Sequence, residues 1–505
     1  MDSVLTPKVP LFRALFPVLG TTLRVVGASL FAVLAITFPF VWWLGPLSLA
    51  LYFYDLWQAR TWKGALWRGF VFGFAVGGAG AWWFWGTLPL DWLGLKHSDL
   101  QWYFVLASWL PVTLALSAVP ALLAIAQWLL RKSPFLPITT ALLFVFAEEG
   151  RMWSFALLTF GDRGLMGSHF SSASLGYVLT ENHYLLQLAQ GGGIYFLNFV
   201  IAFMGACLAY VVLRRKELVQ VHTRELVVCG ALLLGILVFP LFEHPPETPG
   251  EPLIAVLVTT DLPVGMASTS PALYMDLLRQ TATSTPQADL IIFPEEFHLE
   301  GHFKTSEEKE NAFTSAFKGR DVLVLESHHE RSGETKGFNT SLSYDDGTGH
   351  ILATYAKRFM MPGGEYMPVL MRDVFSLLPD PGITHFLGTI PEKLGPQTDL
   401  ATVPFHGYTV GGLVCSDFLS PHMYRALGRD AHATILVNIA NTAWFHHSHI
   451  LYDKTLEISK VHAVQSRAYY LQAANGSPSY AIDPTGTLIA QTPWGMVGLL
   501  PVTIH

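Results

Sequence analysis

Three reactive side chains in the second half of the chain each follow a short apolar run. Glu295 follows IIFP, Lys357 follows ATYA and Cys415 follows GGLV. Such runs are typical of strands, and loops at the edge of a sheet commonly carry binding and catalytic residues. We therefore expect a carboxylate, an ammonium and a thiol to share one site.

These three groups suit nucleophilic catalysis. A free thiol has a pKa of about 8.5, so it is mostly protonated at neutral pH. A carboxylate that takes its proton, or a cation that favours the thiolate, turns the thiol into a nucleophile. An ammonium beside the attacked carbonyl stabilises the oxyanion that forms. The pattern predicts Cys415 as nucleophile, Lys357 as electrostatic stabiliser and Glu295 as base.

Each of these residues also has an ordinary structural interpretation. A single cysteine is most often a buried, inert thiol. The structural alternatives are a solvated surface lysine for Lys357 and a helix N-terminal acid for Glu295. A second acid, Glu296, follows Glu295 directly. The sequence therefore leaves open which of the two acids would be the base.

The composition of the chain is that of a membrane protein. Of its 505 residues, 51% are hydrophobic and only 14% are charged, and the mean hydropathy is +0.38. Apolar runs dominate up to Phe242, and from Glu243 onward the sequence is typical of a globular domain. We predict an α-helical membrane bundle over 1–245 and a soluble domain over 246–505.

Seven stretches of the first half are long and apolar enough to span, or nearly span, a bilayer. The first two are separated by little more than a turn near Pro39, which predicts a tight hairpin. The predicted spans are 25–40, 41–57, 66–86, 103–130, 137–156, 191–213 and 226–242.

The basic residues of the connecting segments predict the orientation of this bundle. One set of alternate connections carries twelve Lys and Arg residues and the other set carries three. Because basic residues favour the cytoplasmic side, we expect the N-terminus in the cytoplasm and everything after Phe242 on the outer face. The twelve are Lys8, Arg13, Arg24, Arg60, Lys63, Arg68, Arg131, Lys132, Arg214, Arg215, Lys216 and Arg224, and the three are Lys96, Arg151 and Arg163.

This orientation changes the interpretation of Cys415. Outside the cytoplasm, exposed thiols tend to be oxidised and structural cysteines tend to form disulfides. The other two cysteines, Cys207 and Cys229, lie inside predicted spans and cannot reach Cys415. A lone cysteine in this compartment is either deeply buried or retained for its reactivity.

The soluble half alternates β-rich runs with helical stretches, which predicts a layered α/β domain. The net charge of −7 and the absence of a basic stripe argue against nucleic acid as a partner. The histidine clusters lack the spacing of metal ligands, so we expect neither a metal nor a cofactor. Predicted strands are 253–260, 288–296, 321–329, 338–346, 408–416, 433–441 and 477–486, and predicted helices are 271–285, 307–318, 421–429 and 451–470.

Around the three reactive residues the sequence resembles the carbon–nitrogen hydrolase (nitrilase) superfamily. The similar segments are DLIIFPEE, YAKRFMMPGGEYMP and VNIANTAWF. In the membrane half, ASLFAVLAITFPFVWWLGPLSLAL and LAQGGGIYFLNFVIAF narrow the resemblance to the apolipoprotein N-acyltransferase family. This resemblance covers nearly the whole chain. It implies an αββα sandwich on a bundle of about seven spans in the bacterial inner membrane, with the catalytic domain in the periplasm.

The resemblance also implies roles for individual residues. Glu295 would be the general base, Lys357 the oxyanion-stabilising lysine and Cys415 the nucleophile. The implied reaction moves a fatty acyl chain from a membrane phospholipid, through a thioester, to the α-amino group of a diacylglyceryl-cysteine apolipoprotein. It needs no cofactor and no metal, and we expect a monomer. The supporting residues would be Glu365, Asp417, Asn441 and Trp444.

Several positions depart from the family pattern. An aromatic residue and a glutamate usually follow the cysteine, whereas this chain has Ser416 and Asp417. Thr442 and Gln465 also replace residues typical of the family. These changes bear on rate and substrate preference. The alternatives to an acyltransferase are a membrane-tethered amidase or hydrolase with the same three residues, and an inactive lipoprotein-binding relative.

Overall fold

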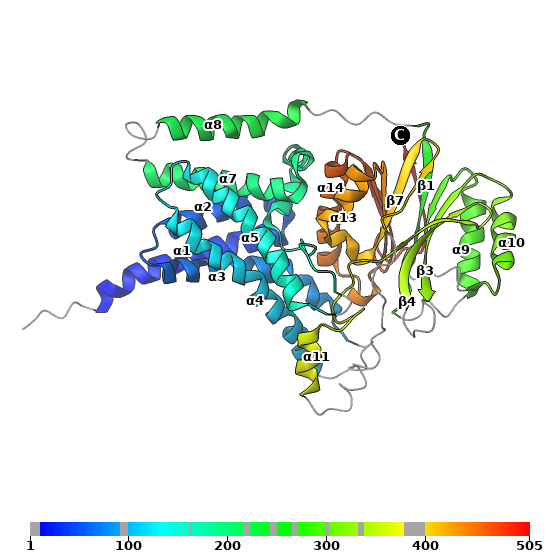
Figure 1. Cartoon of the computed structure of the whole chain (residues 1–505), viewed down its shortest axis with the longest axis horizontal. Helices are drawn as coiled ribbons and strands as arrows, with labels where there is room; N and C mark the ends of the chain where they lie inside the picture. Colours follow the sequence, from blue (N-terminus) through cyan, green and yellow to red (C-terminus); the bar gives the residue numbers. More distant parts are fainter. Residues whose placement is uncertain are drawn as a thin grey trace, which may run out of the picture.

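The computed structural model consists of a helical half followed by a half built on two β-sheets (Figure 1). The two halves lie side by side along the longest axis of the molecule. The structure describes residues 11–90, 99–161, 164–215, 223–242, 250–264, 271–295, 297, 302–331, 338–377 and 399–505. The predicted domain boundary at 245/246 lies outside these residues and stays a prediction.

A helix lies at each of the seven predicted apolar stretches, within the part of the chain that the structure describes. Among the described residues, three helices are long and apolar enough to cross a membrane, namely Gln101–Leu129, Gly193–Arg214 and Arg224–Phe242. The helical bundle and these three candidate spans are therefore established, and seven crossings are not. The helices are α1 (Leu11–Thr37), α2 (Leu44–Trp57), α3 (Trp62–Gly80), α4 (Leu100–Leu129), α5 (Leu136–Leu158), α7 (Gly193–Arg214) and α8 (Thr223–Val238).

Glycines at four-residue spacing let α3 and α4 pack closely. Gly69, Gly73 and Gly77 lie on one face of α3 and meet small side chains and backbone of α4. A Cβ at Gly69 would lie 2.9 Å from the Cα of Ala121. In a membrane, close backbone approach replaces the hydrophobic effect as the main source of helix–helix attraction.

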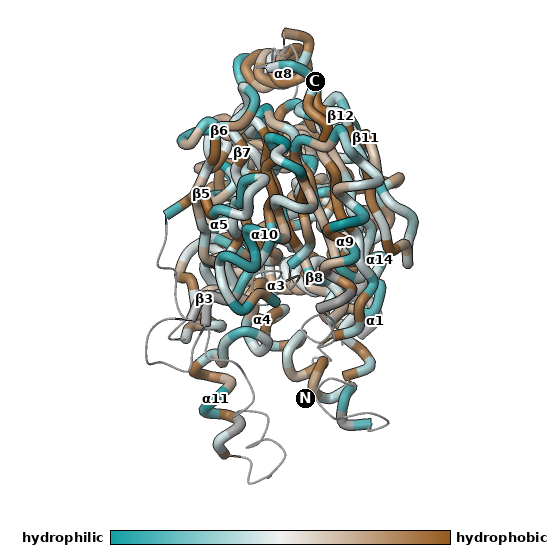
Figure 2. Tube along the Cα trace, turned by 90° about the vertical axis from the view of Figure 1, so that its right-hand side faces the viewer, coloured by the Kyte–Doolittle hydropathy of each residue, from teal (hydrophilic) through white to brown (hydrophobic). Residues whose placement is uncertain are grey.

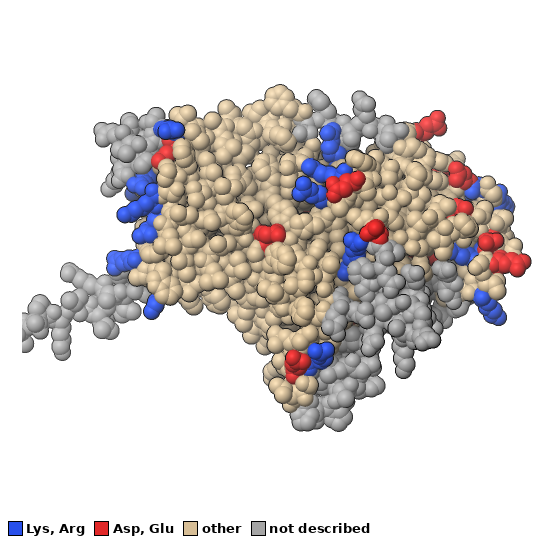
Figure 3. Space-filling view, viewed as in Figure 1, with Lys and Arg blue, Asp and Glu red and all other residues tan. Residues whose placement is uncertain are grey.

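Charged side chains are concentrated at one end of the bundle. Figure 3 shows Lys and Arg gathered at the end of the helical half that lies farthest from the sheets. At this end the buried Asp55 carboxylate of α2 accepts hydrogen bonds from Arg24 at 2.9 Å and Arg68 at 2.5 Å. These ion pairs link α1, α2 and α3.

In the described part of the second half, two six-stranded sheets form the core. The first has the order β12-β1-β2-β3-β4-β5 and the second β11-β10-β9-β8-β7-β6. Their strands are β1 (Leu253–Thr259), β2 (Leu290–Ile292), β3 (Leu323–Arg331), β4 (Phe338–Asp346), β5 (Ile351–Ala356), β6 (Thr402–Phe405), β7 (Tyr408–Val414), β8 (Ile435–Asn441), β9 (Tyr469–Asn475), β10 (Tyr480–Ile482), β11 (Leu488–Gln491) and β12 (Gly498–Ile504).

Helices cover the outer faces of both sheets. The helices α9 (Pro271–Ser284) and α10 (Ser306–Phe317) pack on the first sheet, through Phe313 and Phe317 among others. In Figure 2, α10 is largely hydrophilic and lies on the side of the molecule that faces away from the bundle. The helices α13 (Pro421–Arg425) and α14 (His449–Ser466) lie between the second sheet and the bundle (Figure 1). The αββα layering implied by the family resemblance is therefore present.

The sequence predicted most of the helices and strands that the structure describes, but it missed the strands β6, β9, β11 and β12 and one important boundary. The strand predicted at 338–346 coincides with β4, and the helix predicted at 271–285 nearly coincides with α9. The helix predicted at 451–470 was too long, because it ends at Ser466 and β9 begins at Tyr469. Arg467 takes a left-handed φ of 54° at this junction. A residue in that conformation ends a helix and redirects the chain.

We predict that Gly69→Val lowers the thermal stability of the detergent-purified protein. The new side chain would meet the α4 backbone, and overpacking of this kind costs about 2 kcal/mol. The matched control is Gly230→Val on α8, where a Cβ would have nothing within 4 Å. Melting curves that are equally shifted for the two variants would refute the close α3–α4 contact.

Candidate active site

The three predicted catalytic residues come from both sheets and meet at one end of the sandwich. Glu295 follows β2 and Lys357 follows β5, both in the first sheet. Cys415 follows β7 of the second sheet and begins the short helical turn η8 (Cys415–Leu419). The site therefore exists only when the two sheets are packed face to face.

Lys357 lies between two carboxylates. Its Nζ donates to Glu295 Oε1 and to Glu365 Oε1, each at 3.0 Å. The lysine is buried, with 4% of its surface exposed. The second oxygens of the carboxylates are also held: the Asn441 backbone N–H donates to Glu295 at 3.1 Å, and the Met361 N–H donates to Glu365 at 2.7 Å. Both acids are thus fixed in orientation around the ammonium.

The environment of Lys357 keeps it charged. Burial opposes the ammonium, but the thiolate form of Cys415 and the carboxylates of Glu295 and Glu365 outweigh it and raise the pKa of Lys357 well above its ordinary value. A buried ammonium with carboxylate partners is a fixed positive charge. The solvated surface lysine that was one interpretation of the sequence is therefore wrong.

Cys415 occupies a strained turn beside these groups. Its φ of 48° lies in the left-handed region, which non-glycine residues rarely adopt. Strain of this kind persists only where the surroundings impose it, and it is concentrated at functional sites. The thiol is half-buried, and burial raises the pKa of Cys415, with the Glu295 carboxylate adding to the effect and Lys357 opposing it. At neutral pH the thiol holds its proton, next to Glu295.

Asp417 ties η8, which we term the nucleophile turn, to residues 357–369, which we term the lysine loop. One oxygen accepts from the Phe359 N–H at 2.7 Å and the Arg358 N–H at 3.3 Å, directly after Lys357. The other accepts from the Tyr355 hydroxyl at 2.9 Å and the Val414 N–H at 3.1 Å. Burial raises the pKa of Asp417 to about 6, although these hydrogen bonds favour the ionised form.

The other predicted supporting residues have different positions. Asn441 lies at the end of β8, where its side chain accepts from Asn475 at 2.9 Å and from the Ala443 N–H at 3.1 Å. Trp444 is half-buried in the neighbouring turn η10 (Ala443–Phe445). Glu365 is the second acid on Lys357. Glu296 lies outside the described residues, so the choice between the two acids rests on the contacts of Glu295 alone.

Of the residues that depart from the family pattern, some lie next to the reactive groups and others lie farther away. Ser416 donates its hydroxyl to the Phe359 carbonyl and so adds to the link made by Asp417. Thr442 donates to the Asn475 carbonyl at 2.9 Å. Gln465 is buried on α14 and lies against Gly193 of α7, in the contact between the two halves.

Sequence reasoning missed two residues that hold this site. Tyr355, one residue before the end of β5, is buried and donates to Asp417. Asn475, at the end of β9, bonds Asn441 and also accepts from Thr260 at 2.8 Å. The only signal for Asn475 was its place after an apolar run, and that run had been included partly in a helix.

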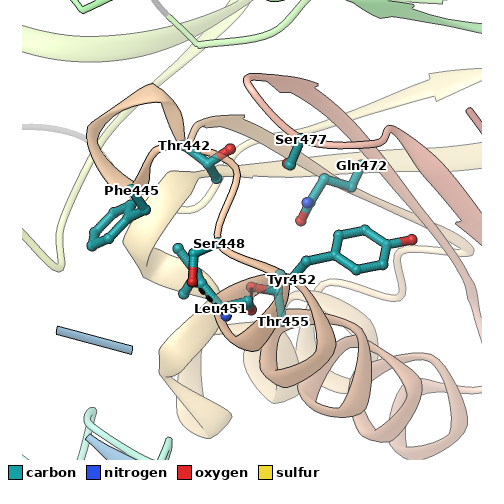
Figure 4. Close-up of a pocket in the computed structure, with 8 residues that line it drawn as sticks. All are labelled: Thr442, Phe445, Ser448, Leu451, Tyr452, Thr455, Gln472 and Ser477. Carbon is teal, nitrogen blue, oxygen red and sulfur yellow. Dashed lines mark hydrogen bonds between the residues drawn. The ribbon is translucent and has the colours of Figure 1, made fainter. Parts of the chain in front are cut away.

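A small pocket lies at the corner between η10 and α14 (Figure 4). Glu295, Lys357 and Cys415 are not among its lining residues. The pocket is therefore separate from the three predicted catalytic groups. It is lined by Thr442, Phe445, Ser448, Leu451, Tyr452, Thr455, Gln472 and Ser477.

Comparison with known protein families covers both halves of the chain. The family model described as apolipoprotein N-acyltransferase N-terminal domain matches residues 28–207. The model described as carbon-nitrogen hydrolase matches residues 267–505. The chain belongs to the apolipoprotein N-acyltransferase family.

Individual relatives cover most of the chain. It is 27% identical to an apolipoprotein N-acyltransferase of Pseudomonas putida, over 92% of this chain and 87% of that protein. It is 26% identical to that of Azotobacter vinelandii, over 90% of this chain and 84% of the relative. Among solved structures, an amidase from Nesterenkonia sp. matches with 16% identity and a TM-score of 0.35, over 51% of this chain and 91% of the amidase.

We predict that Asp417 controls the acidic limb of activity. Its pKa of about 6 exceeds the ordinary aspartate value of about 3.9, so the folded protein takes up a proton as the pH falls through about 6. Because the Asp417 carboxyl binds its proton more tightly in the folded protein than in the unfolded chain, protonation stabilises the folded state. This contribution to the free energy of unfolding is complete below about pH 4 and is lost as the pH rises through about 6. Protonation of Asp417 also weakens its oxygens as hydrogen-bond acceptors for the N–H groups of the lysine loop. Activity should therefore fall below about pH 6.

The measurement is the pH profile of activity for the unchanged protein and for Asp417→Asn. The variant should be weakly active and nearly independent of pH between about 5 and 7. If Asp417→Asn keeps the same acidic limb, another group is responsible for it and this role of Asp417 is excluded.

Proposed function

We propose that this protein transfers a fatty acyl chain from a membrane phospholipid to the N-terminal amino group of a diacylglyceryl-cysteine lipoprotein, through a thioester on Cys415. The observation that carries the proposal is the arrangement at Lys357. A fixed ammonium, an oriented carboxylate and a strained, half-buried thiol converge at one point. Membership of the apolipoprotein N-acyltransferase family supports the substrate class.

In the first half-reaction the Cys415 sulfur attacks the ester carbonyl of the phospholipid. The thiol proton passes to Glu295, which lies beside it. The tetrahedral oxyanion forms next to the Lys357 ammonium, whose charge does not depend on the reaction. The ester C–O bond then breaks, and Glu295 returns the proton to the departing lysophospholipid oxygen. The acyl chain remains on Cys415 as a thioester.

In the second half-reaction the lipoprotein amine attacks the thioester carbonyl. Glu295 accepts a proton from the amine, and the C–S bond breaks as the amide forms. The proton on Glu295 then neutralises the departing thiolate. A thioester suits this exchange because it reacts readily with amines and persists while water is excluded.

The proposed setting is the bacterial inner membrane, with about seven spans and the sheet domain in the periplasm. Basic side chains at the far end of the bundle support this orientation, since they favour the cytoplasmic side (Figure 3). The three candidate spans support membrane insertion. Both proposed substrates are lipids or lipid-modified, which accounts for a catalytic domain held against the bilayer.

The test is an intact mass of the detergent-purified protein, with and without phospholipid, beside Cys415→Ser. We predict a mass gain of one fatty acyl chain that hydroxylamine removes and that Cys415→Ser does not show. Loss of the nucleophile should lower acyl transfer by on the order of a thousandfold or more. An acyl adduct of equal size in Cys415→Ser would contradict the assignment, and release of free fatty acid alone would favour the hydrolase alternative.

A further inference from the structure

The membrane half contains a serine-rich loop that contacts the turn following Cys415. The relevant segment is Ser168–Ser174, between α5 and the turn η4 (Leu175–Glu181). It lies between the bundle and the half built on the two sheets, since it bonds to both. Its sequence, SHFSSAS, offers short hydroxyl side chains that bond backbone groups at close range.

The loop is attached firmly to the bundle. The Ser172 hydroxyl donates to the Gly80 carbonyl at the end of α3 at 3.0 Å and accepts from Trp83 Nε1 at 3.1 Å. Ser174 bonds Arg151 of α5 at 3.4 Å. All of these serines are buried. The loop is therefore packed and hydrogen-bonded within the membrane half.

The same loop makes hydrogen bonds to the turn after Cys415. Ser171 donates twice to the Leu419 carbonyl, from its backbone N–H at 3.2 Å and from its hydroxyl at 2.7 Å. His169 Nδ1 lies 2.7 Å from the Ser420 hydroxyl, and the Ser168 hydroxyl lies 2.7 Å from His422 Nε2. The two bonds to the Leu419 carbonyl satisfy an acceptor at the end of η8, where a short helical turn leaves carbonyls without internal partners.

The end of α5 holds the lysine loop in a similar way. The Tyr366 hydroxyl donates to the Thr159 carbonyl at 2.8 Å, and the Val369 N–H donates to the Phe160 carbonyl at 2.8 Å. The His169 ring also lies 5.9 Å from the Phe359 ring, next to the Asp417 contact. The segments that follow Lys357 and Cys415 are therefore both hydrogen-bonded to the membrane half.

We propose that Ser168, His169 and Ser171, which we term the serine clamp, position Cys415 for acyl transfer. The inference rests on the proposed function and extends it: the active site is completed by the membrane half. A left-handed residue such as Cys415 keeps its conformation only when the surroundings impose it. The clamp fixes the downstream end of the turn, and Asp417 fixes the upstream end through Val414.

The loop itself supplies a matched pair of variants. Ser171 and Ser172 are adjacent and fully or nearly fully buried, and each hydroxyl makes two hydrogen bonds. Ser171 bonds Leu419 and Tyr177, whereas Ser172 bonds Gly80 and Trp83 of the bundle. Ser171→Ala and Ser172→Ala should therefore cost similar stability and differ in their effect on Cys415.

The experiment measures single-turnover thioester formation on the full-length protein in detergent with a phospholipid donor. We expect Ser171→Ala to slow the maximum rate about tenfold, because small displacements of a nucleophile have large effects on rate. The phospholipid concentration for half-maximal rate should not change. Ser172→Ala should keep the original rate, and Ser171→Thr, which retains a hydroxyl, should recover most of it.

Hydrogen exchange of the peptide around 415–425 gives a readout that does not need turnover. Exchange should quicken in Ser171→Ala and remain unchanged in Ser172→Ala. If Ser171→Ala does not fold, His169→Phe keeps the ring contact with Phe359, loses the bond to Ser420 and should show the same loss of rate.

The outcomes separate this inference from the proposed function. Equal rates for Ser171→Ala and Ser172→Ala, with thioester formed by both, would overturn the clamp and leave the proposed function intact. Faster hydrogen exchange of 415–425 in Ser171→Ala, without slower thioester formation, would also overturn the positioning role of the serine clamp. If the unchanged protein forms no thioester at all, the proposed function is refuted. Faster hydrogen exchange of 415–425 in Ser171→Ala alone would then still support the contact between Ser171 and Leu419.

Discussion

The buried Lys357 ammonium is the group around which the rest of the site is organised. Removing such a charge from water costs several kcal/mol unless carboxylates surround it, and here Glu295 and Glu365 do so from opposite segments. With both acids ionised, the three groups carry one net negative charge. A thiolate on Cys415 would add another in the same buried space. Transfer of the thiol proton to Glu295 leaves the total charge unchanged, which explains why the nucleophile and the base must lie next to each other.

This charge balance depends on segments that are far apart in the sequence. Glu295 and Lys357 belong to one sheet and Cys415 to the other. Asp417 links the lysine loop to the nucleophile turn, and the Asn475–Asn441 pair supports the backbone N–H that holds Glu295. The helices α13 and α14 and the serine clamp then attach the second sheet to the bundle. The membrane half therefore contacts the segments that follow Lys357 and Cys415, and in the proposed setting it also anchors the catalytic domain at the bilayer.

The sequence predicted the features that depend on local pattern. Apolar runs ending in Glu295, Lys357 and Cys415 gave the strands and the residues that the structure brings together, because strand periodicity and strand ends are local properties. The family resemblance supplied the sandwich and the importance of Glu365. Contacts between distant segments were not accessible in this way. Ser171 and Leu419 are 248 residues apart, and nothing in either segment indicates the other. Helix length and composition establish three candidate spans among the described residues, and the count of seven stays a prediction; α2, for example, has 14 residues and carries Asp55.

The central claim is that the acyl chain reaches the lipoprotein amine by way of Cys415. The most direct measurement begins with protein carrying an isotopically labelled acyl chain on Cys415, freed of phospholipid, to which a diacylglyceryl-cysteine peptide is added. The account predicts that label leaves Cys415 at the rate at which it appears in an amide on the peptide, with the two amounts equal. Label that is released as free fatty acid, or a peptide that is acylated only when phospholipid is present, would contradict it.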